Sequence, residues 1–327
     1  MKAIIPVAGS GTRLRPLTHS KPKALLRVGS KPIIAHIIES LLSMGCRELV
    51  LIISNEGGKI PLFVKESYPD VIVETVIQKN CLGLGHAVSL TEKIARDSEL
   101  IIIYGDTIIE GDLSEIIDPA LDGVIAVKEV DDPRRFGVVN IENGIISRFV
   151  EKPSLPESNL AIVGLNYIKD SNALFDSLKE IIAGDKKTKG EYQITDAFQL
   201  MVERGCKLKP YTIDGWFDAG TLETLLATNS YMLKKDGNCT SLEGSVIIPP
   251  VFIPDNATIS NAIIGPDVSV GDNAHIVTSI ISDSIIGSGA TITNVCLSGS
   301  LIGDNSEVIE RSRKLAIGDN SSLNFDI

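Results

Sequence analysis

The stretch Ala3-Ile4-Ile5-Pro6-Val7-Ala8-Gly9-Ser10-Gly11-Thr12-Arg13, near the start of the chain, decides which fold to expect. Its first half is apolar and has the composition of a buried β-strand, and its second half is a glycine-rich loop. Glycines in such a loop allow backbone N–H groups to close around phosphate oxygens. Arg13 and Lys23 offer positive charge to the same anion. The segment therefore predicts a cradle for a nucleoside triphosphate at the end of a strand.

Two better-known phosphate loops do not fit this segment. A Walker loop ends in Gly-Lys-Ser/Thr, whereas Gly11 is followed by Thr12 and Arg13. A dinucleotide-binding loop has a third glycine three residues after the second, where this chain has Leu14. A strand-to-helix turn without a ligand is the remaining alternative, and the cations nearby count against it.

The loop and several later blocks resemble the sugar-1-phosphate nucleotidyltransferases, also called NDP-sugar pyrophosphorylases. In chain order these blocks are residues 9–18, 21–26, 78, 82–87, 105–106, 136–139, 151–153, 163–164, 190–196 and 216–221. Motifs that follow one another in this order over so much of a chain do not arise by chance. The resemblance is greatest to the glucose-1-phosphate thymidylyl- and uridylyltransferases.

Composition and charge exclude other classes of protein. The chain has 327 residues and a formal net charge of −11, from 31 Lys and Arg against 42 Asp and Glu. Nucleic-acid binding needs a broad basic surface, which this balance disfavours. No apolar stretch approaches the roughly 18 residues of a membrane span, and Ser10 and Arg13 interrupt any signal-peptide pattern. We therefore expect a cytoplasmic protein without a membrane partner.

Residues 1–235 alternate short apolar runs with helical stretches, a pattern typical of an α/β fold. The runs 49–53, 100–104 and 123–127 predict strands, and the residues from Ile33 to Met44 predict a helix. Together with the resemblance, this predicts a Rossmann-like nucleotidyltransferase domain with a mainly parallel mixed sheet. Ligands of such sheets bind beyond the carboxyl ends of the strands, where Gly9 and Asp106 fall.

A short unit of the form aliphatic-Gly/Pro-x-x-small recurs after a polar stretch at residues 234–238. The units are residues 253–257, 264–268, 270–274, 286–290, 302–306 and 317–321. The last four starts are 16, 16 and 15 residues apart, which fits a solenoid with three short strands in each coil. The repeats resemble the hexapeptide repeats of left-handed parallel β-helices, and this resemblance implies a short β-helix over residues 236–327. We expect it to mediate assembly into a homo-oligomer.

The resemblance implies that a hexose-1-phosphate, most simply glucose-1-phosphate, attacks the α-phosphorus of dTTP or UTP, with thymidylyl transfer favoured by residues 131–139 and uridylyl transfer by residues 82–87. Such a reaction needs positioning and charge neutralisation, commonly with Mg²⁺. The resemblance assigns Mg²⁺ to Asp106 and Asp218, and assigns catalytic roles to Arg13 and Lys23, with Lys21 as the alternative lysine.

The resemblance also implies which residues bind the two substrates. For the nucleotide they are Ala8, Gly9, Ser10, Gly11, Thr12, Gln78 and Gly83; for the sugar phosphate they are Gly137, Glu151, Lys152 and Val163. The amide of Gln78 can both donate and accept, which suits the edge of uracil or thymine. His86 either belongs to the nucleotide site or packs on its loop. Thr195 and Asp196 are expected to cap a helix that begins there.

Two other functions remain open at this point. The repeats of some relatives carry acetyltransferase activity, but His275 is the only histidine within these repeats that could serve as a base. A regulator that binds an NDP-sugar without catalysis is the other alternative. Such a protein would have no need for Asp106 and Asp218.

Overall fold

The computed structural model describes residues 1–55, 57–238, 241–311 and 316–322. The chain divides into two compact units, Met1–Thr228 and Asn229–Ile327. The boundary lies within helix α7 (Leu222–Asp236), whereas the sequence suggests a division after residue 235, at the end of that helix. The domain limits 1–235 and 236–327 therefore stay a prediction. Among the described residues, no helix is both long enough and apolar enough to cross a membrane.

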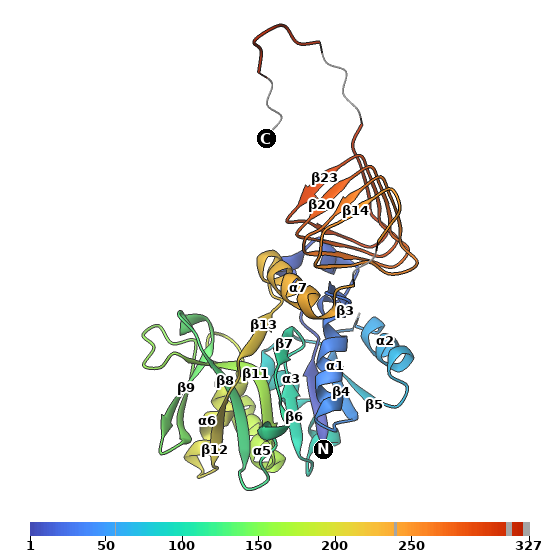
Figure 1. The fold of residues 1–327 in the computed structure, drawn as a ribbon. Helices are drawn as coiled ribbons and strands as arrows, with labels where there is room; N and C mark the ends of the chain where they lie inside the picture. The colour runs from blue at the N-terminus through green and yellow to red at the C-terminus, as the bar shows by residue number, and fades with distance from the viewer. Residues whose placement is uncertain (56, 239–240, 312–315, 323–327) are drawn as a thin grey trace. The chain divides into compact units, whose positions relative to one another are not determined.

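A mixed nine-stranded sheet forms the centre of the first unit (Figure 1). Seven strands follow one another in the order β10-β9-β11-β6-β1-β4-β5, while β8 pairs with β11 and with β12. In chain order the strands are β1 (Lys2–Pro6), β4 (Glu48–Ile53), β5 (Ile72–Ile77), β6 (Leu100–Ile103), β8 (Gly123–Glu129), β9 (Gly137–Glu142), β10 (Ile145–Glu151), β11 (Leu160–Ile168) and β12 (Leu208–Thr212). The α/β fold with a mixed sheet is thus confirmed.

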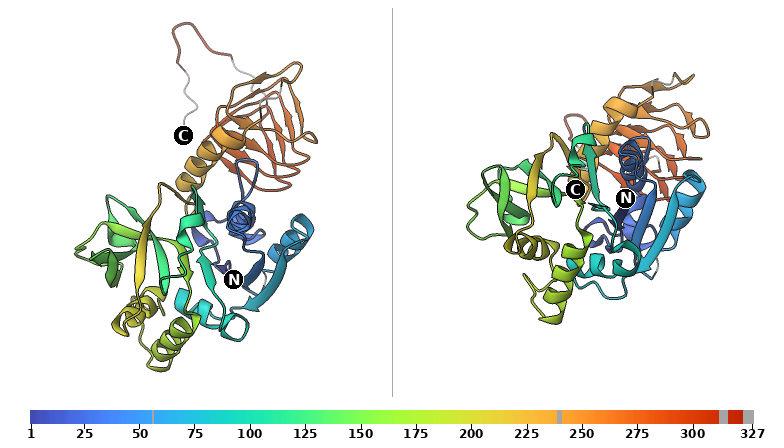
Figure 2. Two further views of the ribbon diagram at one scale, coloured as in Figure 1. Left: turned by 60° about the horizontal axis from the view of Figure 1, so that its bottom comes forward. Right: turned by 90° about the horizontal axis from the view of Figure 1, so that it is seen from below.

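Helices cover both faces of this sheet (Figure 2). They are α1 (Ile33–Ser43), α2 (Lys59–Ser67), α3 (Leu84–Ser89), α4 (Glu92–Ala95), α5 (Ser171–Ala183) and α6 (Ile194–Glu203). Ile4 packs in one apolar cluster with residues of α3, α5 and α6. Its neighbours Ala3 and Ile5 point to the opposite face and are also fully buried. A strand buried on both faces has no polar position, which explains the continuous apolar run near the start of the chain.

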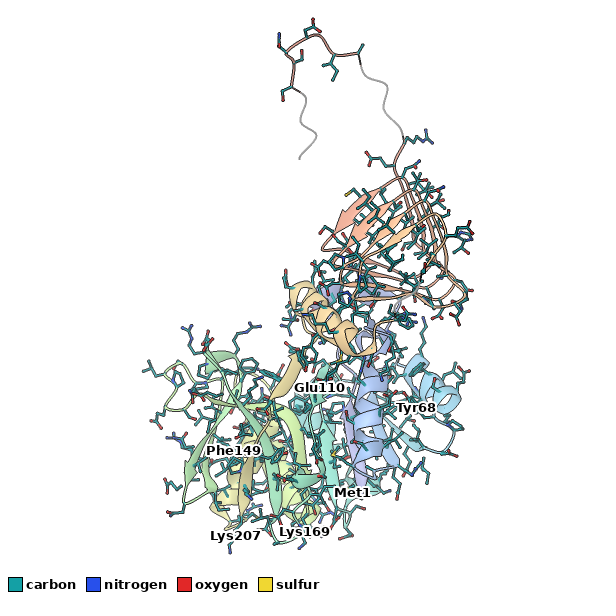
Figure 3. All side chains as sticks on the ribbon, viewed as in Figure 1. Met1, Tyr68, Glu110, Phe149, Lys169 and Lys207 are labelled. Carbon is teal, nitrogen blue, oxygen red and sulfur yellow. The ribbon has the colours of Figure 1, made fainter. Side chains whose placement is uncertain are left out.

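An aromatic pair closes the core at the other end of the sheet. Phe149 of β10, which Figure 3 labels, has its ring centroid 5.6 Å from that of Phe198 of α6, and both residues are buried. Their contact fixes α6 against β10, and the residues at the end of that strand and the start of that helix thereby come together.

Four adjacent parallel strands of the sheet, β6, β1, β4 and β5, bring three distant loops to one edge. β1 pairs in parallel with β4 and β6, and β4 pairs in parallel with β5. The carboxyl ends of all four strands therefore point the same way. The loops that follow β1, β5 and β6 carry Gly9, Gln78 and Asp106.

Two short ribbons complete the first unit. β2 (Arg27–Val28) pairs with β3 (Lys31–Pro32). β7 (Thr107–Glu110) pairs antiparallel with β13 (Gly215–Asp218), and its register sets Asp218 opposite Thr107. The backbone N–H of Ala219 donates to the carbonyl of Asp106 at 3.1 Å. This ribbon therefore brings Asp106 and Asp218 together from positions far apart in the sequence.

The second unit contains three parallel sheets of four short strands each, as in the left-handed β-helix expected from the repeats (Figure 1). The first sheet is β14 (Val246–Ile247), β17 (Ile263–Ile264), β20 (Ile280–Ser282) and β23 (Cys296–Ser298). The second is β15 (Val251–Phe252), β18 (Val268–Val270), β21 (Ser284–Ile286) and β24 (Leu301–Ile302). The third is β16 (Thr258–Ser260), β19 (His275–Val277), β22 (Thr291–Thr293) and β25 (Glu307–Ile309).

Identical positions stack from coil to coil inside this unit. Ile259 pairs with Ile276, and Ile276 pairs with Ile292, so that one row of isoleucines fills the interior. The last predicted repeat, residues 317–321, is wrong as a coil. Ile317 lies outside any strand and is 56% exposed, and within the described parts of the chain it pairs with no strand of a preceding coil.

The three outer faces of the β-helix differ in chemistry. On the third sheet the outward row begins with Thr258 and His275, and it is polar. The second sheet is covered by the end of α7, where the Ser269 hydroxyl donates to Asn229 Oδ1 at 2.6 Å and both residues are fully buried. The outward row of the first sheet is Val246, Ile263, Ile280 and Cys296. Val246 is 56% exposed and Ile280 is 50% exposed, so this apolar row faces solvent.

Candidate active site

Two adjoining cavities lie at the carboxyl edge of the parallel strands. The first has a volume of about 280 Å³ and the second about 320 Å³. Leu84, Tyr104, Asp106 and Glu191 line both cavities. Cavities of this size each suit part of a ligand rather than a whole nucleotide sugar. The arrangement therefore suits two substrates that meet near Asp106.

The first cavity gathers part of the predicted nucleotide-binding set. It is lined by the predicted residues Ala8, Gly9, Lys23, Gln78, Gly83 and Asp106. The predicted residues Ser10, Gly11 and Thr12 do not line it. Gly11 has a left-handed φ of 58°, and its carbonyl accepts from the Thr18 hydroxyl at 2.8 Å. Its local role is therefore to turn the chain into the short 3-10 helix Thr12–Leu14.

The second cavity gathers the whole predicted sugar-phosphate set. Its lining includes Arg13, Asp106, Gly137, Glu151, Lys152, Val163 and Asp218. These residues come from six separate segments of the chain. The sheet order brings β9, β10 and β11 side by side, and the β7–β13 ribbon adds the two aspartates.

Opposite charges meet where the two cavities join. Lys23, in the short 3-10 helix Lys23–Leu25, places Nζ 2.8 Å from Asp106 Oδ2. Its alternative, Lys21, lines neither cavity. Burial raises the pKa of the Asp218 carboxyl above its usual value, and the negative charge of Asp106 raises it further. Lys23, Arg13 and Arg135 act in the opposite direction and lower the pKa of Asp218.

Glu151 is held in a fixed position at the floor of the second cavity. Its side chain is 8% exposed, its Oε1 lies 3.3 Å from Lys152 Nζ, and its Oε2 accepts from the Thr195 hydroxyl at 2.7 Å. Gly137 lies against this pair, since a Cβ there would come within 3.0 Å of Glu151 Oε2. The carboxylate is thus oriented by two partners and by the lack of a side chain at residue 137.

Thr195 corrects one expectation from the sequence. Helix α6 does begin at Ile194, but its preceding residue, Gln193, makes no side-chain capping bond, and the Thr195 hydroxyl bonds to Glu151 instead. Sequence reasoning also missed Tyr104 and Arg135 as lining residues. Arg135 directly precedes the Phe136-Gly137 block, and this position beside a family motif is the signal that could have identified it as a lining residue. Tyr104 ends the apolar run before Asp106 and looked like part of the strand.

Arg135 and Arg134 are neighbours in sequence but differ in their surroundings. Arg134 donates to Asp132 through Nε at 2.7 Å and Nη2 at 2.9 Å, away from the cavities. Arg135 lines the second cavity, as does Arg13. Within the described residues, neither of these two guanidiniums has an ion pair or a hydrogen bond. Two cations without partners in a cavity provide a ready site for an anion.

Comparison with known proteins agrees with this geometry. The family model described as Nucleotidyl transferase matches residues 2–235. This chain belongs to that family. The resemblance seen in the sequence motifs is therefore confirmed, and the matched range contains both cavities.

The relatives of this family member include proteins of similar length. The low-salt glycan biosynthesis nucleotidyltransferase Agl11 of Haloferax volcanii is 30% identical over 99% of each chain. A glucose-1-phosphate thymidylyltransferase of Streptomyces antibioticus is also 30% identical over 99% of each chain. The UTP–glucose-1-phosphate uridylyltransferase AglF of H. volcanii is 32% identical over 66% of this chain and 89% of its own.

Solved structures show the same fold. A crystal structure from Bacillus anthracis, of a protein proposed to be a glucose-1-phosphate thymidylyltransferase, superimposes with a TM-score of 0.64. It is 30% identical to this chain and covers 74% of it and 98% of its own length. The nucleotidyltransferase fold is thus shared over most of the chain.

The electrostatic balance at the junction leads to a prediction about Asp218. Asp106→Asn removes a negative charge, so the pKa of Asp218 should fall toward its usual value; Lys23→Met removes a positive charge, so that pKa should rise. Carboxyl carbon chemical shifts, followed by NMR against pH in metal-free buffer, measure both changes. Shifts of the same sign in the two variants would contradict this account of the junction.

Proposed function

We propose that this protein transfers a nucleotidyl group from a pyrimidine nucleoside triphosphate, dTTP or UTP, to a hexose-1-phosphate. The observation that carries the proposal is the pair of adjoining cavities that share Asp106 and that are lined by four cationic side chains: Lys23 in the first, and Arg13, Arg135 and Lys152 in the second. The first cavity would take the nucleotide and the second the sugar phosphate. Family membership supports the reaction class.

In this reaction a phosphate oxygen of the sugar phosphate forms a bond to the α-phosphorus of the triphosphate. The bond from that phosphorus to the bridging oxygen breaks, and its electron pair leaves with pyrophosphate. No covalent intermediate with the protein is needed. The residues therefore act by positioning and by meeting negative charge. Arg13 and Lys23 would stabilise the triphosphate, Lys152 and Arg135 the sugar phosphate, and Glu151 would accept from the sugar hydroxyls.

Asp106 and Asp218 have the chemistry expected of Mg²⁺ ligands. Both offer hard carboxylate oxygens, and burial together with the negative charge of Asp106 raises the pKa of Asp218. Two carboxylates fit an ion that completes its coordination shell with phosphate oxygens and water. When bound, Mg²⁺ would neutralise charge on the phosphates. Lys23 lies against Asp106 and would remain near the same phosphates.

Thymidylyl transfer to glucose-1-phosphate is the favoured form of the reaction, and uridylyl transfer is the alternative. In support, the thymidylyltransferase of S. antibioticus is similar over 99% of both chains, whereas the uridylyltransferase AglF matches 66% of this one.

We also propose that the protein is a homo-oligomer that associates through the first sheet of its β-helix. The outward row Val246, Ile263, Ile280 and Cys296 carries no charge, unlike the outward row of the third sheet, which includes His275 and Glu307. In a two-fold contact, the same surface patch of each copy faces the other. An uncharged apolar row can therefore pack against the same row of a second copy.

The substrates can be identified in one assay. Pyrophosphate release should be measured with Mg²⁺ for dTTP, UTP, GTP, ATP and CTP against the 1-phosphates of glucose, mannose, galactose and N-acetylglucosamine. We expect activity with dTTP or UTP and glucose-1-phosphate, and its loss when EDTA removes the metal. Folded protein that releases no pyrophosphate in any combination would instead support a regulator that only binds.

The two neighbouring arginines provide a matched test of the second cavity. Arg135→Ala should lower kcat/KM for the sugar phosphate about 10- to 100-fold, because a charge-assisted bond is worth roughly 1.5–3 kcal/mol. Arg134→Ala should stay within about twofold, because its exposed pair with Asp132 contributes little. Steady-state kinetics at saturating nucleotide measure both variants. Equal losses of kcat/KM in the two variants would show that activity depends on the positive charge of the loop and not on a specific contact of Arg135.

The oligomer can be tested on two faces of the same coil. Ile280→Asp places a charge in the apolar row and should convert the oligomer to a smaller species, whereas His275→Asp on the polar face should not. Sedimentation velocity measures the size of each variant, with circular dichroism as the check on folding. A monomeric wild-type protein, with and without substrates, would contradict the proposal.

A further inference from the structure

The side chain of Gln78 is held by contacts on its amide nitrogen. Gln78 directly follows β5, is 7% exposed and lines the first cavity. Its Nε2 lies 3.3 Å from the carbonyl oxygen of Gly83 and 3.3 Å from Nδ1 of His86. Gly83 precedes α3 and His86 belongs to its first turn, so one helix end supplies both contacts.

The donor and acceptor roles of its neighbours decide which end of the Gln78 amide is the nitrogen and which is the oxygen. A backbone carbonyl oxygen can only accept, so the atom that faces Gly83 must be the amide nitrogen. The same nitrogen faces Nδ1 of His86, which must then carry a lone pair, with the ring proton on Nε2. Burial lowers the pKa of the His86 imidazole, and this favours the neutral ring that the contact requires.

The other end of the amide is left for a ligand. No described residue donates a hydrogen bond to Oε1 of Gln78, and this oxygen is not one of the fully buried atoms without a partner. Gln78 lines the first cavity, and Oε1 is the atom of its amide that the described residues leave without a hydrogen bond. His86 itself lines neither cavity and acts only through Gln78.

We propose that His86 is a positioning residue, which holds the Gln78 amide with Oε1 toward the nucleobase and so selects a base whose ring nitrogen carries a hydrogen. Uracil and thymine present N3–H and are accepted. Cytosine presents a lone pair at N3, which Oε1 repels. This inference rests on the proposed function, and it deepens that function by deriving a preference for uracil and thymine over cytosine from the orientation of one amide.

Two variants of His86 separate positioning from packing. His86→Leu removes the acceptor, so the amide can turn over. His86→Asn offers a side-chain oxygen close to where Nδ1 lies and should keep the amide oriented. Isothermal calorimetry on the full chain would measure Kd for UTP and CTP in each protein, with Gln78→Ala as the reference for complete loss of the contact.

We expect the Kd ratio of CTP to UTP to fall about tenfold in His86→Leu, the effect of one neutral hydrogen bond, and to stay within about twofold in His86→Asn. In the wild type, the ring ¹⁵N shifts should show a neutral His86 with its proton on Nε2. A proton on Nδ1 would overturn the inference, as would a ratio that changes in Gln78→Ala but not in His86→Leu.

The same measurements separate this inference from the proposed function. UTP binding with the expected ratios but without pyrophosphate release would overturn the transfer reaction and leave the role of His86 intact. If the wild type binds UTP and CTP equally, base selection by Gln78 fails even where the protein is an active nucleotidyltransferase. Equal weakening for both nucleotides in His86→Leu and His86→Asn would reduce His86 to a packing residue.

Discussion

Parallel pairing of β6, β1, β4 and β5 is the constraint on which the site depends. Parallel strands must all end at the same edge, so the loops after β1, β5 and β6 meet there although they are far apart in the sequence. The glycine loop, Gln78 and Asp106 are neighbours for this reason. Three of these strands, β1, β4 and β6, are buried on both faces, so the loops after β1 and β6 extend from a well-packed part of the unit.

A second constraint is the balance of charge at the junction of the two cavities. Two carboxylates lie there in a chain that is negative overall, and burial together with the charge of Asp106 disfavours ionisation of Asp218. Lys23, 2.8 Å from Asp106, offsets part of this repulsion, while Arg13 and Arg135 lower the pKa of Asp218 without forming an ion pair to any described residue. The cations are therefore placed where phosphate groups would bring still more negative charge.

Sequence analysis predicted the features that depend on local pattern. Gly9 and Asp106 follow apolar runs directly, so their place at strand ends could be inferred from neighbouring residues. The period of the coils followed from the spacing of glycine and aliphatic residues, but residues 317–321 repeat the pattern without forming a strand in the part of the chain that the structure describes. The bond from Thr195 to Glu151 could not be foreseen, because it arises from the packing of α6 on β10. Nor could the difference between Arg134 and Arg135, because both are charged residues in one short loop.

The β-helix differs from the α/β unit in how its contacts extend. Each of its strands pairs only with the strands one coil before and one coil after, in three separate stacks. The energy of such a stack is close to a sum over neighbouring coils, so a coil gained or lost at the end leaves the others almost unchanged. Over evolutionary time, the length of this part of the chain can thus vary by whole coils, while insertions into the sheet of the first unit would displace the loops that carry the site.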